Sequence, residues 1–142
     1  MAVDYLASAC QKFRTKTAVS LEAAAVHIII PAQARRILVT RFIVVPQVIG
    51  GTPDAESACS ISLGTDASSY QNIIGDDGNL FRPSELTPVN FAEEYDLQLI
   101  GNHHQYVQYA DLTASGLRVN IQLAGTNGFT YTAHFLVEGA IF

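Results

Sequence analysis

Several features that would assign this chain to a common protein class are scarce or missing. Trp is absent, only two residues are Cys, and 15% of the 142 residues are charged. Two cysteines cannot form a disulfide framework, and a hydrophobic content of 49% with so little charge argues against disorder. No apolar run approaches the length of a membrane span, and the first residues lack the basic and apolar regions of a signal peptide. We expect one soluble domain, made in a cytoplasm and without a membrane partner.

The two cysteines, Cys10 and Cys59, each lie among small or apolar residues. Such surroundings predict two free, partly buried thiols, with a disulfide between them as the alternative. The sequence leaves the redox state of both open.

The charges are distributed unevenly along the chain. Eleven of the thirteen acidic residues follow residue 50, whereas six of the eight basic residues lie in the first 41 positions: Lys12, Arg14, Lys16, Arg35, Arg36 and Arg41. The net charge of −5 makes nucleic acid an unfavourable partner for the whole domain. The basic N-terminal segment could instead dock on an acidic surface of a partner.

The clearest structural signal is the alternation of apolar and polar residues in two C-terminal runs, residues 117–123 and 129–137. A period of two places each apolar set on one face of a strand. Residues 124–128, Ala-Gly-Thr-Asn-Gly, can supply the positive φ of a tight reversal. The sequence therefore predicts a long antiparallel hairpin with one buried face.

Shorter strand signals recur upstream, separated by turn residues. We expect strands at residues 17–21, 26–30, 35–45, 59–63, 95–100 and 105–110, with Pro31 and Pro46 ending two of them. Residues 22–25 and 101–104 are expected to be turns, and residues 64–79 a long polar connection. About eight short strands without a convincing long helix predict an all-β fold, an antiparallel jelly-roll-like β-sandwich over residues 17–142. An immunoglobulin-like sandwich is the alternative.

Residues 1–16 fall outside this strand pattern, and we expect an N-terminal arm or short helix there. Tyr5, Leu6 and Phe13 supply apolar groups, and Lys12, Arg14 and Lys16 supply positive charge, so these six residues are predicted to bind a partner. The strand at residues 35–45 has no clean polar face, which predicts cover on both sides. Together with the low charge content it predicts a homo-oligomer, and a trimer is expected.

No residue pattern in the sequence predicts catalysis, a metal or a cofactor. His103 and His104 are adjacent and would point to opposite faces of a strand, and His27 and His134 are interpreted as structural. Residues 76–79, Asp-Asp-Gly-Asn, lack the spacing of a calcium loop, and a solvated turn is expected instead. The acidic residues Glu93, Glu94 and Asp96 are interpreted as surface charge rather than as a glycosidase pair.

Residues 60–74, which read Ser-Ile-Ser-Leu-Gly-Thr-Asp-Ala-Ser-Ser-Tyr-Gln-Asn-Ile-Ile, resemble a stretch in small β-sandwich virion proteins of tailed bacteriophages. There a strand ends in Gly-Thr and runs into a loop with Tyr and Asn. Residues 26–31, the Ala-Arg-Arg at 34–36 and the Gly-x-x-Tyr-Thr at 128–132 fit the same resemblance. The family implied is the jelly-roll capsid decoration, or cement, proteins, which form trimers on the head and bridge capsomers. Under this resemblance Tyr70 and Asn72 join the expected partner-binding residues.

The function expected from these observations is that of a non-enzymatic virion protein, a capsid decoration subunit on the head surface. Its partners would be its own copies and the major capsid protein, without nucleic acid. A receptor- or glycan-binding module of a phage tail fibre is the alternative from another class, and a cupin-like enzyme is a more distant one. The sequence does not distinguish head from tail.

Overall fold

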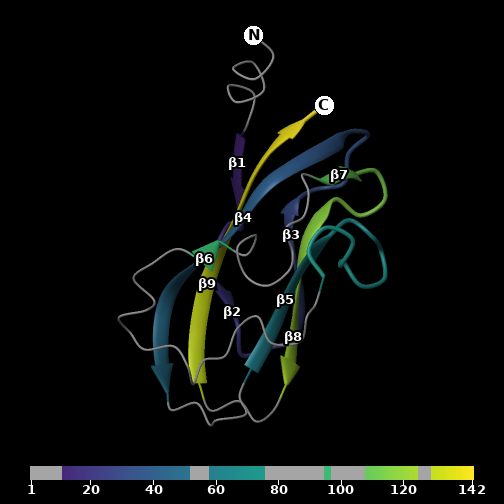
Figure 1. Ribbon diagram of the computed structural model, residues 1–142. Helices are drawn as coiled ribbons and strands as arrows, with labels where there is room; N and C mark the ends of the chain where they lie inside the picture. The colour runs from purple at the N-terminus through teal and green to yellow at the C-terminus, as the bar shows by residue number, and fades with distance from the viewer. Residues whose placement is uncertain (1–10, 52–57, 76–94, 97–107, 125–128) are drawn as a thin grey trace.

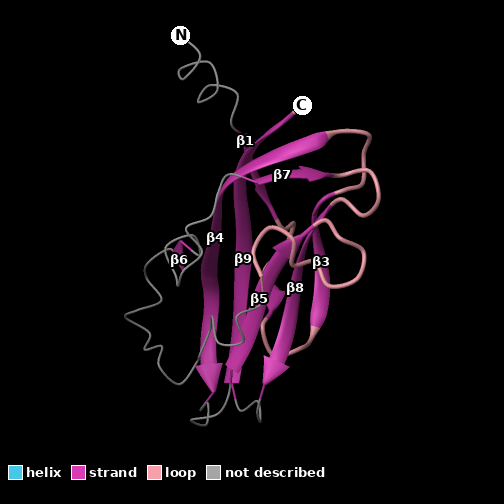
Figure 2. Ribbon diagram, turned by 45° about the vertical axis from the view of Figure 1, so that its right-hand side comes forward, coloured by secondary structure: helices cyan, strands magenta, loops and turns pink. Residues whose placement is uncertain are grey.

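The computed structural model describes residues 11–51, 58–75, 95–96, 108–124 and 129–142, and these residues form two antiparallel β-sheets with no helix (Figures 1 and 2). The larger sheet holds β1 (Gln11–Arg14), β2 (Val19–Ser20), β4 (Arg36–Gly51), β6 (Tyr95–Asp96), β7 (Gln108–Asp111) and β9 (Phe129–Ile141). The smaller sheet holds β3 (Ala25–Ile30), β5 (Ala58–Gly64) and β8 (Leu117–Ala124). The all-β antiparallel sandwich predicted from the sequence is confirmed.

The order of the strands is that of a jelly roll. In the larger sheet β9 lies between β4 and the collinear pair β1 and β2, while β6 and β7 line the far side of β4. In the smaller sheet β8 lies between β3 and β5. From β2 to β5, and again from β7 to β9, consecutive strands alternate between the sheets, as in a jelly roll and unlike a simple meander. No helix among the described residues is long and apolar enough to cross a membrane.

The core lies between the two sheets and consists of the alternating apolar residues predicted from the sequence. Phe42 of β4 and Phe135 of β9 are fully buried at its centre, with ring centroids 5.8 Å apart. The smaller sheet contributes the inward sides of β5 and β8, whose fully buried residues are Cys59, Ile61, Leu63, Leu117, Val119 and Ile121.

The predicted C-terminal hairpin is wrong, although both of its strands exist. β8 pairs with β3 and β5, and β9 pairs with β1, β2 and β4, so the two strands belong to opposite sheets. Their apolar faces meet across the core instead of lying side by side. A period of two specifies the buried face of a strand, and a hairpin and a sandwich satisfy that pattern equally well.

Pro46 was predicted to end the strand that begins near residue 35, but β4 continues through it to Gly51. The register against β9 shifts between Pro46 and Val48, and the short strands on the far side of β4 pair only with residues 36–44. Pro46 therefore lies where the register is irregular and where no described strand pairs with the far side of β4. The missing N–H of proline is tolerated at such a position.

A second register shift explains why β4 has no polar face. It falls between Val39 and Arg41, so Val39 points into the core before it and Phe42 points into the core after it. Leu38 and Ile43 do not belong to the core cluster, yet they are only 5% and 3% exposed. The predicted burial of this strand on both faces is confirmed.

Candidate partner-binding surfaces

The first candidate surface is built on the connection that follows β5, of which residues 65–75 are described. The Asn72 side chain closes this loop at its base: its Oδ1 accepts hydrogen bonds from the backbone N–H groups of Thr65 at 2.7 Å and Asp66 at 3.3 Å. Its Nδ2 donates to the Thr65 hydroxyl at 3.0 Å. The polar atoms of Asn72 thus hold the loop in shape, and its predicted partner-binding role stays a prediction.

Asp66 orders the tip of the same loop. Its carboxylate accepts hydrogen bonds from the Ser69 hydroxyl at 2.7 Å and from the backbone N–H groups of Ser69 at 3.3 Å and Gln71 at 2.8 Å. Partial desolvation raises the pKa of Asp66, but the hydrogen bonds from Ser69, Gln71 and the Asn72 backbone outweigh it and leave that pKa below its ordinary value. The carboxylate therefore remains charged and bonded to the loop near neutral pH.

The loop is also tied to the smaller sheet. Backbone hydrogen bonds join Leu63 to Ile74 in both directions, at 3.0 and 2.9 Å, and Asn120 Nδ2 of β8 donates to the Ser69 carbonyl at 3.2 Å. The Asn120 bond holds the tip of the loop against the outer face of the smaller sheet, whereas Ile74 pairs with the edge of β5 and its side chain belongs to the core. The loop is consequently pre-ordered before any partner arrives.

Tyr70 is the most conspicuous residue that the loop displays. Its φ of 54° lies in the left-handed region, which costs a non-glycine residue about 1 kcal/mol and must be held by its surroundings. The Arg118 guanidinium lies 5.6 Å from the centre of the Tyr70 ring, and Arg118 Nε donates to the Ser115 carbonyl at 2.8 Å. The loop and β8 together fix an aromatic–arginine pair at the surface.

Two exposed apolar side chains continue this surface onto β3. Ile28 pairs in register with Arg118, and Val26 pairs with Asn120, so both point outward on the same face of the smaller sheet. Ile28 is 51% exposed and Val26 is 43% exposed. We call Val26, Ile28, Tyr70 and Arg118 the outer patch. Of these four residues the sequence predicted only Tyr70. The uniformly apolar run at residues 26–30 does not reveal that Val26 and Ile28 are outward, and Arg118 joins the patch only through its pairing with β3.

The basic N-terminal segment differs from the predicted free arm. Residues 11–14 form β1 and pair with residues 136–139 of β9. Phe13 packs against the core, and Lys12 Nζ lies 3.6 Å from Glu138 Oε1. Placing Lys12 and Phe13 outside the sheets was therefore wrong. β1 is only four residues long and mostly exposed, so a local period of two is hardly visible there. Tyr5 and Leu6 lie outside the described residues.

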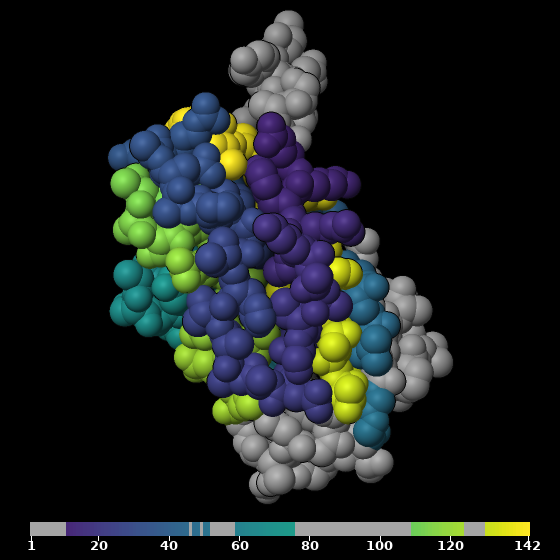
Figure 3. Space-filling model, turned by 180° about the vertical axis from the view of Figure 1, so that it is seen from behind, coloured from purple at the N-terminus to yellow at the C-terminus, as the bar shows by residue number. Residues whose placement is uncertain are grey.

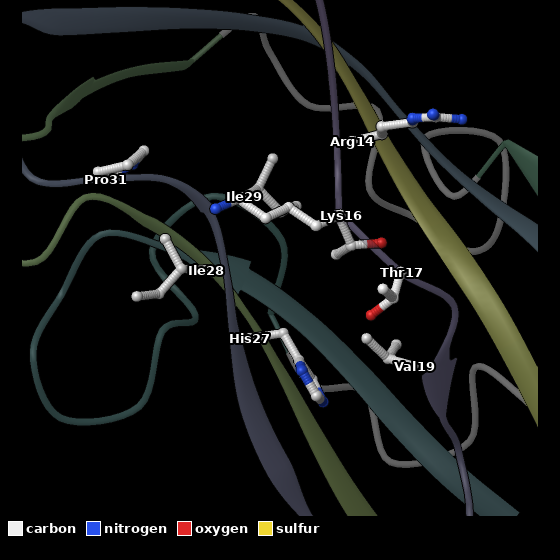
Figure 4. Close-up of a pocket in the computed structure, with 9 residues that line it drawn as sticks. Arg14, Lys16, Thr17, Val19, His27, Ile28, Ile29 and Pro31 are labelled. Atoms are coloured by element: carbon white, nitrogen blue, oxygen red, sulfur yellow. The ribbon is translucent and has the colours of Figure 1, made fainter.

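The second candidate surface is a groove of about 430 Å³ between this segment and β3. It is lined by Arg14, Thr15, Lys16, Thr17, Val19, His27, Ile28, Ile29 and Pro31. Figure 3 shows the face on which the purple N-terminal segment lies beside the indigo of β3. In Figure 4 the Lys16 side chain extends toward β3, whereas Arg14 points away from it. Of the three predicted partner-binding cations, Arg14 and Lys16 line the groove, and Lys16 is the one that extends across it toward β3.

His27 lies at the base of this groove and was interpreted from the sequence as structural. Its Nε2 is buried and has no hydrogen-bond partner among the described residues. Burial lowers the pKa of His27 below its ordinary value. The imidazole is therefore neutral near pH 7 and offers one unused polar atom beneath the surface.

The described part of the chain brings together no set of metal ligands. In residues 11–51, 58–75, 95–96, 108–124 and 129–142, no three His, Cys, Asp or Glu side chains are grouped to hold an ion. Cys59 is a free, buried thiol, as predicted. Cys10, His103, His104, Glu93, Glu94 and the 76–79 turn lie outside the described residues.

Comparisons of this chain with protein-family models, with curated proteins and with solved structures found no match. The two surfaces are therefore interpreted from their own geometry and chemistry.

Proposed function

We propose that this protein is a non-enzymatic structural protein of a virion, a capsid decoration subunit that binds the outside of the head shell. In this proposal it assembles as a homotrimer, and its partner is the major capsid protein. The observation that carries the proposal is the outer patch, in which the exposed Val26 and Ile28 of β3 continue a half-buried aromatic–arginine pair held between a pre-ordered loop and β8. The residues that form this loop, 65–74, are also those over which the resemblance to capsid decoration proteins is most specific.

The composition of the outer patch suits protein binding. Tyr and Arg are the residues most often found at the energetic centres of interfaces. Complete burial of an Ile or Val side chain contributes roughly 1.5–3 kcal/mol. Because Ile28 and Val26 are about half exposed, a partner that covers them would gain about half of this free energy from each. Because the loop is already ordered, binding would lose little conformational entropy there. A rigid apolar surface of this kind supports attachment better than it supports chemistry.

The location can be tested by immunogold labelling of purified phage particles with antibodies against the recombinant protein. Gold on the heads is the expected result. Gold confined to tail tips would support the alternative, a receptor- or glycan-binding module of a tail fibre. Particles that carry none of the protein would overturn both assignments.

The role of the outer patch can be tested with particles stripped of this protein. Ile28→Ser and Tyr70→Ala should each weaken rebinding about tenfold or more, because each removes an interface anchor. Thr130→Ala, an exposed change on β9 of the other sheet, is the control and should bind normally. Equal binding by all three variants would mean that attachment uses another surface.

A further inference from the structure

The groove beside β3 has a property that the outer patch lacks: it is bordered by the open edges of both sheets. β3 pairs with β8 on one side only, and no described strand pairs with its other edge. Across the groove, β1 and β2 form the edge of the larger sheet. An unpaired strand edge presents a row of backbone donors and acceptors to any extended chain that fits beside it.

The charge of the groove restricts what could fit. Two of its nine lining residues are cations, Lys16 and Arg14, of which only Lys16 points toward β3, and none of the nine is acidic. The remaining ones are Thr, apolar residues and His27. Lys16 extends over the groove toward β3 (Figure 4). Its concave surface therefore favours a negatively charged occupant with apolar side chains facing inward.

Two further observations point to an occupant in an extended conformation. His27 Nε2 is buried without a partner at the base of the groove, so a polar group of the occupant could satisfy it. Pro31 follows directly after β3 and lines the groove at that end, where its missing N–H limits pairing to the length of β3. The groove thus offers a site one short strand in length.

We propose that this groove binds an extended acidic segment of a partner protein, which adds to the free edge of β3 as a further strand. Main-chain hydrogen bonds to β3 would supply affinity, and Lys16 would select acidic over basic segments. The groove shares Ile28 with the outer patch, but Lys16 and the edge of β3 belong to the groove alone, and the inference does not depend on where in a virion the protein resides.

The probe is a short fluorescent peptide of alternating valine and glutamate. Its fluorescence anisotropy is measured as the full-length protein is added. The same peptide with lysine in place of glutamate is the control for charge and should not bind. Alternate N–H groups of a strand point to opposite sides. Two N-methylated versions, one for each set of alternate residues, should therefore differ: one loses binding and the other retains it. If both N-methylated versions bind, the main-chain N–H groups are not used and strand addition is wrong. If the parent peptide itself does not bind, the proposal is also wrong.

The protein variants are matched in charge. Lys16→Glu should weaken peptide binding about tenfold or more, whereas Lys12→Glu should change it less than about twofold, because Lys12 lies on β1 beside Glu138 and outside the groove. Equal losses for both variants would indicate only a general effect of net charge and would overturn the assignment.

The same Lys16 variants also test whether Lys16 serves instead to keep the strand edge from pairing with other copies of the protein. If Lys16→Glu or Lys16→Ala leaves peptide binding unchanged but makes the protein self-associate, Lys16 protects the strand edge from other copies, and the proposal is wrong. Failure of the peptide experiment leaves particle binding through the outer patch intact, since Tyr70→Ala, which changes a residue outside the groove lining, reports on that function separately.

Discussion

At the scale of single residues, Gly64 determines whether the loop after β5 can close. A Cβ at this position would lie 2.7 Å from the backbone nitrogen of Gln71 and would also overlap Tyr70 and the Asn72 side chain. Gly64→Ala should lower the free energy of unfolding by about 1–3 kcal/mol, because backbone atoms must move. Urea unfolding would measure the change.

The matched control for Gly64 is Gly50→Ala in β4. The nearest atoms to a Cβ there belong to Thr130, at 3.9 Å, which is an ordinary contact. This variant should unfold at nearly the same urea concentration as the wild type. A Gly64→Ala protein as stable as Gly50→Ala would show that the loop does not depend on the close approach.

Cys59 should make the folded protein less stable at alkaline pH. Burial raises the pKa of its thiol to about 12 from an ordinary 9.0, so the folded state holds this proton more tightly than the unfolded state. Its contribution to stability is complete below pH 9 and is lost as the pH rises from 9 toward 12, by up to about 1.4 kcal/mol per pH unit. Urea unfolding across this pH range would measure the loss.

A Cys59→Ala variant isolates the part that comes from the thiol. It should be less stable than the wild type at neutral pH, because it leaves a cavity in the core, but it should lose less stability above pH 9. Parallel curves for the two proteins would contradict the assignment. In a Cys10→Ser background, Cys59 should also resist alkylation at neutral pH until the chain unfolds.

At the scale of elements, β1 is an integral strand of the larger sheet. Phe13→Ala should lower the free energy of unfolding by about 1–3 kcal/mol, less than for a fully buried ring, because Phe13 is only partly buried against the core. Lys12→Ala removes only an exposed ion pair and should cost less than about 1 kcal/mol. Thermal unfolding of the two variants would rank them.

The same reasoning changes what a truncation should do. Deleting residues 1–10 removes no contact among the described residues, whereas deleting residues 1–16 removes β1 and exposes the edge of β9. The longer deletion should therefore unfold at a clearly lower temperature than the shorter one, because it also removes β1. Equal stability of the two truncated proteins would show that residues 11–16 do not stabilise the larger sheet and act as an arm.

At the scale of the whole molecule, we expect the subunits to associate through an exposed aromatic pair. Tyr109 of β7 and the C-terminal Phe142 are 66% and 58% exposed, and their rings meet edge to face at 5.4 Å between centroids. Light scattering should give three times the 15.3 kDa mass of one chain. The double variant Tyr109→Ser, Phe142→Ser should be monomeric, because an interface loses its apolar centre.

Val48→Ser is the control for this experiment, since Val48 is similarly exposed but lies on β4. It should leave the trimer intact. A wild-type protein that remains at the mass of one chain at micromolar concentration would contradict the proposed assembly.

The sequence by itself determined where most of the strands lie and, wherever apolar and polar residues alternate, which of their faces is buried. Alternation placed Val119 and Phe135 in the core correctly, because the direction of a side chain from a strand depends only on the local period of two. Uniformly apolar stretches were harder: nothing local to residues 26–30 distinguishes the exposed Ile28 from the buried Ile29.

Only the tertiary structure decided which strands are neighbours. β8 and β9 face each other across the core instead of pairing, β1 completes the larger sheet, and β4 passes through Pro46 beside a change of register. Each of these depends on contacts between residues far apart in the chain, whose energies a local pattern does not contain. The outer patch and the groove are products of the same pairings: Ile28 lies beside Arg118, and Lys16 lies beside β3, only because the sheets assemble in this order.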